Sequence, residues 1–122
     1  MKKIYHLSTC DKCRGIIKRL NGLPDFVKQD IKTEPICEED LDHLKILVGS
    51  YEALFSKRAQ LYHEMKLKHD DLNENDYRKY LLRDYTFLKR PVIVMDDQIF
   101  VGNESHTIEA LEITVNGTAD DP

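Results

Sequence analysis

Two cysteines separated by two residues, Cys10 and Cys13, are the side chains of this sequence best suited to chemistry. A thiolate is a nucleophile, and a second thiol at this spacing can resolve the mixed disulfide that the first one forms. Half of a zinc site and two small buried side chains are the alternatives. Zinc needs two further ligands, and Cys37 with His6 or His43 has no recognisable zinc spacing. We therefore favour redox or nucleophilic use of Cys10 and expect no metal site.

The cysteine pair lies where the periodicity changes from strand to helix. Residues 1–7 alternate and are rich in strand-forming side chains. Apolar residues then recur at the spacing of one helix face: Cys13, Ile16, Ile17 and Leu20. Cys10 is thus expected at or just before the first helical turn. There the unpaired N–H groups and the positive end of the helix dipole favour a thiolate over a thiol.

His6 and Cys37 are weaker candidates. His6 precedes Cys10 by four residues and could lower the pKa of that thiol, although a histidine at a strand end is more often simply solvated. Cys37 precedes a predicted helix, where capping or packing is the plainer interpretation. Sequence alone does not bring Cys37 near Cys10.

Two arginines and a proline form the second chemical signal. Arg58 and Arg90 offer forked donors that suit tetrahedral oxyanions or carboxylates, although surface salt bridges are the commoner use of a single arginine. Pro91 opens a predicted strand. A cis bond there would place backbone groups beside the thiol in a thioredoxin-like fold, but trans is the default expectation.

Length and composition narrow the class of protein. The 122 residues fit one domain, and no apolar run approaches the roughly 20 residues that a membrane span needs. The net charge of −4 argues against direct DNA binding, because that binding relies on neutralising phosphates with basic residues. The beginning of the chain lacks the apolar stretch of a secretory signal. We therefore expect a cytoplasmic protein.

The order of the predicted elements indicates the fold. After the first strand and helix we expect a strand over 25–31, helices between 38 and 85, a hairpin of 91–95 and 98–102, and a last helix from about 104 to 111 or 113. This order predicts an α/β, thioredoxin-like fold. Its mixed sheet of about four strands has a helical insertion between the βαβ and ββα halves.

The domain boundaries follow from the same pattern. We expect a single domain over 1–113 with the insertion at about 38–85. Residues 114–122 are small, polar and acidic, so they are predicted to be a flexible tail.

Several short motifs together carry a family resemblance. They are Tyr5-His6 followed by Cys10 and Arg14, Leu54-Phe55-Ser56-Lys57-Arg58 with Tyr62, Lys89-Arg90-Pro91-Val92-Ile93-Val94, and Val101-Gly102. Spread over about residues 3–111, they resemble the arsenate reductase (ArsC) family that uses glutathione and glutaredoxin, together with its relative Spx.

The resemblance implies roles for particular residues. It implies Cys10 as the nucleophile, His6 as the residue that lowers its pKa, and Arg58 and Arg90 as oxyanion binders. Arg14 matches a family position in the helix after the nucleophile. No bound cofactor is implied, and glutathione, glutaredoxin or thioredoxin would restore the thiols.

Two departures from the family affect the expected activity. The glutathione-coupled reductases carry a third oxyanion-binding arginine where this chain has Val101-Gly102-Asn103, so arsenate reduction is expected to be weak and Asn103→Arg is not expected to lower it. Those reductases usually lack the second cysteine of the loop, whereas Spx has a CxxC disulfide switch.

The leading hypothesis is therefore a thiol oxidoreductase in which Cys10 attacks and Cys13 resolves. Its substrate would be a small oxyanion, a glutathione conjugate or a protein disulfide. The alternative is an Spx-like redox switch that binds an RNA polymerase subunit. A thioredoxin-like binding module with incidental thiols is the third possibility.

Overall fold

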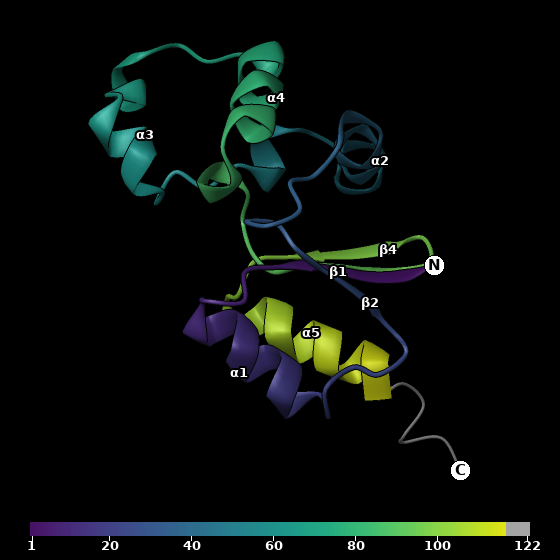
Figure 1. Ribbon diagram of the computed structural model, residues 1–122. Coiled ribbons are helices and arrows are strands. Elements are labelled where there is room, and N and C mark those ends of the chain that lie inside the picture. Colours follow the sequence, from purple (N-terminus) through teal and green to yellow (C-terminus); the bar gives the residue numbers. More distant parts are fainter. Residues whose placement is uncertain (117–122) are drawn as a thin grey trace. The chain divides into compact units, whose positions relative to one another are not determined.

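The computed structural model describes residues 1–116, which form two compact units (Figure 1). The first unit combines Met1–Asp30 with the described residues from Arg90 onward, and the second is Ile31–Lys89. Most of the predicted tail, residues 117–122, lies outside the described residues.

A four-stranded sheet forms the centre of the first unit. Its strands are β1 (Lys2–His6), β2 (Val27–Asp30), β3 (Val92–Met95) and β4 (Gln98–Val101). They are arranged in the order β2-β1-β3-β4, with β1 parallel to β2 and antiparallel to β3, and β3 antiparallel to β4. The predicted mixed sheet with its closing hairpin is therefore confirmed. The parallel β1–β2 pair requires a crossover connection, which the first helix provides.

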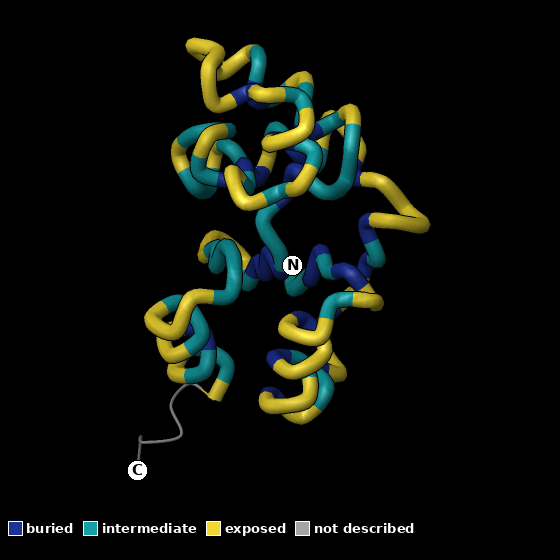
Figure 2. The backbone as a smooth tube through the Cα atoms, turned by 90° about the vertical axis from the view of Figure 1, so that its left-hand side faces the viewer, coloured by how far each residue is buried: buried dark blue, intermediate teal, exposed yellow. Residues whose placement is uncertain are grey.

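Helices α1 (Asp11–Arg19) and α5 (Ser105–Asn116) lie side by side on one face of this sheet (Figure 1). Their apolar sides bury a core that includes Ile4, Ile16, Leu20, Ile93 and Leu111. In Figure 2 the buried positions gather along the strands, while the turns of the helices carry many exposed positions. The sheet and α1 together fix the point at which Cys10 enters its helix.

Two predicted boundaries in this unit were wrong. Helix α5 continues to Asn116, beyond the expected end at 111 or 113, because Val115 still packs against the core. Strand β2 starts at Val27 rather than at residue 25, because the N–H of Phe26 donates to the carbonyl of Leu23 in the preceding turn.

The second unit is helical, as predicted, but its helices are short. They are α2 (Glu38–Val48), η1 (Glu52–Leu54), α3 (Gln60–Glu64), η2 (Leu67–His69), α4 (Glu74–Arg83) and η3 (Tyr85–Phe87). Lys66 adopts a left-handed backbone conformation between α3 and η2. Asn73 and Asp76 form a reciprocal capping box that starts α4. These local features divide the segment further than the polar interruption at 68–71 predicts.

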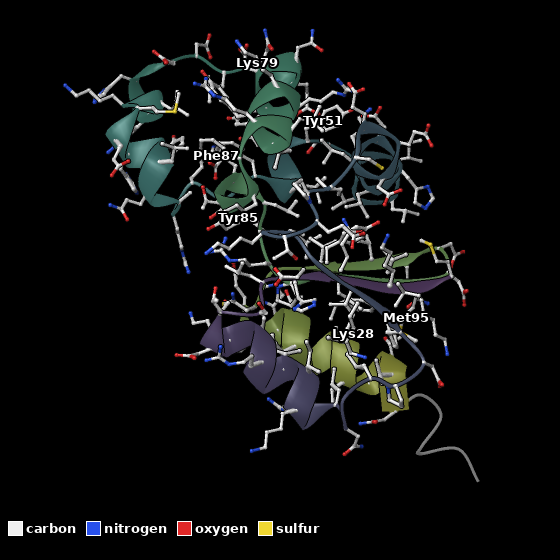
Figure 3. The ribbon with its side chains drawn as sticks, viewed as in Figure 1. Lys28, Tyr51, Lys79, Tyr85, Phe87 and Met95 are labelled. Atoms are coloured by element: carbon white, nitrogen blue, oxygen red, sulfur yellow. The ribbon has the colours of Figure 1, made fainter. Side chains whose placement is uncertain are left out.

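Aromatic side chains and a polar network hold the second unit together. Phe87, labelled in Figure 3, is buried. Its ring stacks on that of Phe55 at 5.0 Å between centroids and also approaches the ring of Tyr80 in α4. Arg78 of α4 donates to the carboxylate of Asp42 in α2, from Nε to Oδ1 at 2.8 Å and from Nη2 to Oδ2 at 3.1 Å. The network therefore joins α4 to α2.

Candidate functional site

Cys10 is the residue immediately before α1, as the change of periodicity predicts. It has an extended backbone with φ −90° and ψ 118°, and its N–H donates to the carbonyl of Leu7 at 3.0 Å. Its own carbonyl accepts the first helical bond, from the N–H of Arg14 at 3.1 Å. Cys10 therefore lies at the N-terminal end of the helix. Its side chain is only half-buried, so the thiol is still accessible.

The surroundings of Cys10 favour its ionised form. Partial burial opposes ionisation, but the N–H and thiol of Cys13, the N–H of Lys12 and the charge of Arg90 all act in the other direction. Together they hold the pKa of Cys10 below its ordinary value. The predicted contribution of His6 stays a prediction. His6 ends β1, half-buried, opposite Asp30 in the β1–β2 register.

Cys13 has the opposite character. It is fully buried one turn into α1, and that burial, together with the negative charge on Cys10, raises its pKa to about 11. A hydrogen bond from the N–H of Leu7 and the charge of Arg90 only partly offset these effects. Both thiols are free in the structure. The pair thus consists of an accessible thiol that ionises easily and a buried thiol that stays protonated and hydrogen-bonds to it.

Side-chain hydrogen bonds fix the loop in front of the thiols. Ser8 donates through Oγ to Oδ2 of Asp30 at 2.5 Å, which ties the end of β1 to the end of β2. Arg14 donates through Nη1 to the carbonyl of Ser8 at 2.8 Å and through Nη2 to the carboxylate of Asp11. In this structure Arg14 therefore braces the cysteine loop, and its anion-binding role stays a prediction. The Ser8–Asp30 hydrogen bond was not predicted from the sequence, because neither residue belongs to a motif. The signal that could have found it is that parallel strands end at the same edge of the sheet, where both residues lie.

The peptide bond between Arg90 and Pro91 is cis, so the default expectation of a trans bond was wrong. Pro91 is buried, and its carbonyl accepts from the N–H of Gly102 at 2.9 Å. The carbonyl of Arg90 accepts from Nδ2 of Asn103 at 3.0 Å. Arg90 itself is half-buried and acts electrostatically on both Cys10 and Cys13. The first unit alone therefore brings together the thiols, Arg90 and Pro91.

The remaining predicted residues belong to the second unit. Arg58 is exposed and lies in the segment between η1 and α3. Cys37 is exposed at the start of α2, where its side chain makes no capping hydrogen bond. Their predicted relation to the thiol pair stays a prediction.

An open groove of about 340 Å³ runs between α1 and the start of α5. It is lined by Lys12, Gly15, Ile16, Arg19, Asn103 and Ile108. Arg19 is bound to Glu112 through two hydrogen bonds, of 2.8 and 3.1 Å, so its charge is largely compensated there. Lys12 and Asn103 are the other polar side chains that line the groove.

The described residues show neither a metal cluster nor a membrane-spanning helix. Within residues 1–116, no three His, Cys, Asp or Glu side chains are grouped as a metal ion would need. No helix in that part of the chain combines the length and apolar character of a membrane span.

The sequence of this chain matches a known protein family and one known regulator. The sequence pattern of the ArsC family matches residues 5–111. The global transcriptional regulator Spx of Lactiplantibacillus plantarum is 24% identical over 101 residues, which cover 81% of this chain and 76% of that protein.

Solved structures share the fold. A putative ArsC family related protein from Bacteroides fragilis aligns with a TM-score of 0.76 and 21% identity, over 90% of this chain and 96% of that one. An arsenate reductase from Vibrio cholerae aligns with a TM-score of 0.74 and 21% identity, over 92% and 96% respectively. These likenesses confirm the predicted thioredoxin-like α/β fold.

Proposed function

This chain belongs to the ArsC family, and we propose that it is a thiol–disulfide oxidoreductase with Cys10 as nucleophile and Cys13 as resolving thiol. The observation that carries the proposal is the contrast between the two thiols. An accessible sulfur with a lowered pKa accepts a hydrogen bond from a buried sulfur whose pKa is raised to about 11. A nucleophile must be ionised before attack, whereas a resolving thiol has to react only after the mixed disulfide has formed.

The proposed reaction has two exchange steps. The Cys10 thiolate attacks one sulfur of a substrate disulfide, which forms a mixed disulfide and expels the other sulfur as a thiolate that takes up a proton. Cys13 then loses its proton and attacks Sγ of Cys10. This step closes the Cys10–Cys13 disulfide and releases the second substrate thiol. Two electrons pass from the protein dithiol to the substrate.

A reductant must then restore the dithiol. Two molecules of glutathione would do this, leaving glutathione disulfide, and a glutaredoxin or thioredoxin dithiol would do it in one exchange. No bound cofactor is needed. Such reductants are maintained in the cytoplasm, which is where the proposal places the protein.

The choice of substrate rests on the anion-binding residues. Arg90 acts on both thiols, while Arg14 is engaged with Ser8 and Asp11 in this structure. We therefore favour a disulfide or a glutathione conjugate over a small oxyanion, with His6 and Arg58 as supporting residues that the family resemblance implies.

The deciding experiment follows each cysteine by mass spectrometry after treatment with glutathione disulfide. In wild type we expect a transient glutathione adduct on Cys10, then the Cys10–Cys13 disulfide, and recycling by added glutathione. Cys13→Ser should trap the adduct, and Cys10→Ser should abolish it. Cys37→Ser is the matched control, because it removes an exposed thiol of the second unit and should leave the course unchanged. A first adduct on Cys37 would overturn the assignment.

An Spx-like redox switch is the second candidate, and the likeness to the Spx regulator favours it. In that case the Cys10–Cys13 disulfide would alter binding to an RNA polymerase subunit rather than be turned over. Repeated NADPH consumption through glutathione and glutathione reductase, with a disulfide other than glutathione disulfide as the oxidant and lost in Cys10→Ser, supports the enzyme. A single oxidation that glutathione does not reverse, combined with redox-dependent binding of the subunit, supports the switch.

A further inference from the structure

Asn103 makes a side-chain hydrogen bond to the backbone of Arg90. It follows the left-handed Gly102 and precedes α5, and its Nδ2 donates to the carbonyl of Arg90 at 3.0 Å. The next carbonyl, of Pro91, is held by the N–H of Gly102 at 2.9 Å. Two successive carbonyls at the entrance to β3 are thus anchored to the segment that joins β4 to α5. Of these two hydrogen bonds, only the one from Asn103 involves a side chain.

The anchored backbone carries the arginine of the thiol site. The Arg90 side chain leaves the main chain at the residue whose carbonyl Asn103 holds, and its charge reaches both Cys10 and Cys13. Its Nε is fully buried, so the guanidinium stem runs through packed surroundings rather than through solvent. A shift of the main chain at Arg90 would therefore move the guanidinium relative to the thiols.

We propose that Asn103 is a positioning residue of the thiol site, whose amide fixes the backbone at Arg90 and so keeps the guanidinium beside Cys10. This inference rests on the proposed function, because it assumes that Cys10 is the reactive thiol. Asn103 touches neither thiol in this account; it acts through Arg90. An arginine in its place would lose this side-chain hydrogen bond, so Asn103→Arg is expected to slow alkylation of Cys10, a different rate from the arsenate reduction considered from the sequence.

The test measures how fast iodoacetamide alkylates Cys10 across the pH range, with peptide mass spectrometry to identify the modified thiol. Asn103→Ala should slow alkylation of Cys10 near pH 7, by no more than Arg90→Gln does, and should move its pH profile upward. The groups that bear on this profile are Cys13 of α1, the N–H of Lys12 and Arg90 itself. Asn75→Ala, at an exposed asparagine of α4, is the matched control and should match wild type.

A double-mutant cycle separates positioning from general damage. If Asn103 acts through Arg90, then adding Asn103→Ala to Arg90→Gln should change the rate at Cys10 no further. Additive effects, or a wild-type pH profile in Asn103→Ala, would overturn the proposal. Should Asn103→Ala fold poorly, Asn103→Ser keeps a polar side chain that is too short for the bond, and the same outcomes apply. If wild-type Cys10 is not the fastest thiol, the proposed function fails instead.

Discussion

Burial and hydrogen bonding act against each other at the two cysteines, and the balance differs between them. Burial disfavours the thiolate at both positions, but at Cys10 it is only partial and the donors at the start of α1 outweigh it. At Cys13 burial is complete and prevails, and a neighbouring thiolate adds to it. A separation of three residues at the start of α1 therefore suffices to shift the pKa values of the two thiols in opposite directions.

The first prediction concerns pH. Because the pKa of Cys10 lies below its ordinary value, the rate of its alkylation should rise with pH and reach half its plateau at a lower pH than that of an unperturbed thiol. Cys13 should react measurably only as pH approaches its pKa of about 11. Quenching the alkylation at set times, followed by peptide mass spectrometry, gives the rate at each cysteine as a function of pH. Faster reaction of Cys13 than of Cys10 near pH 7 would show that the roles are reversed.

The second prediction concerns Arg90. Arg90→Lys should weaken protection of Cys10 by sulfate, because an ammonium cannot reproduce the forked donors of a guanidinium. Lys89→Arg, at the neighbouring position, keeps its charge and should leave protection unchanged. The readout is the alkylation rate of Cys10 with and without sulfate. Equal protection in wild type and Arg90→Lys would show that the Arg90 guanidinium does not bind the anion.

Residues near in sequence were easier to predict than residues joined by the fold. The place of Cys10 follows from the change of periodicity within a few residues. Asn103 could not be assigned its contact, because the acceptor lies 13 residues away on the other side of a hairpin. The Ser8–Asp30 bond and the cis bond at Pro91 are likewise consequences of tertiary packing.

Among the elements, α1 contains a glycine, Gly15, that lowers its stability, and no neighbouring atom requires a glycine there. Gly15 lies in the middle of this helix, and a Cβ there would meet nothing within 4 Å. Glycine in a helix costs about 0.5–1 kcal/mol relative to alanine, because it loses more backbone freedom on folding.

Gly15→Ala should therefore raise the free energy of unfolding by about 0.5–1 kcal/mol. Gly22→Ala is the contrasting control, because Gly22 has a φ of +82° and a side chain there should cost about 1–2 kcal/mol. Urea denaturation measures both. A loss of stability in Gly15→Ala would mean that the groove beside α1 is narrower than the structure indicates.

In the second unit, the bond between α2 and α4 should make stability depend on pH. The hydrogen bond from Arg78, followed by that from Tyr51, lowers the pKa of Asp42 to about 2. A depressed carboxyl pKa stabilises the fold above the unfolded value of about 3.9, and the contribution disappears as pH falls through the folded value.

Asp42→Asn should therefore lower the melting temperature at pH 7, and the gap from wild type should shrink between about pH 4 and pH 2. Asp71→Asn, at an exposed aspartate of the same unit, should show no such gap. Thermal unfolding at a series of pH values measures both variants. A gap for Asp42→Asn that is constant over this range would show that the carboxylate charge is not what stabilises the pair.

Strand and helix predictions succeeded where a regular pattern was long enough. The alternation of β1, the facing apolar positions of α1 and the two-residue turn of the hairpin are local signals, and each gave the right element. The segment from 51 to 85 was harder. Its apolar spacing is helical, but the left-handed Lys66 and the cap at Asn73 divide it, and neither is visible in periodicity.

For the whole molecule, the question is whether an ArsC family chain with two loop cysteines still suits arsenate. A doubly charged tetrahedral oxyanion in a partly desolvated site needs several charge-assisted hydrogen bonds, each worth about 1.5–3 kcal/mol. The first unit supplies Arg90 and the start of α1, while Arg14 is engaged within the cysteine loop. Asn103 lies in the segment where the family resemblance implies a third arginine, and it directs its donor to a backbone carbonyl.

Losing one such contact should cost about one to two decades of rate or affinity. We therefore expect weak or undetectable arsenate reduction by the wild-type protein, even with glutathione and glutaredoxin, alongside measurable thiol–disulfide exchange. NADPH oxidation coupled through glutathione and glutathione reductase, with arsenate or a disulfide other than glutathione disulfide as the oxidant, measures the two activities under one set of conditions. Cys10→Ser should abolish both, which shows that the signal comes from the thiol site. Saturable turnover at micromolar arsenate would contradict the prediction, because the donors named above would then suffice for the oxyanion.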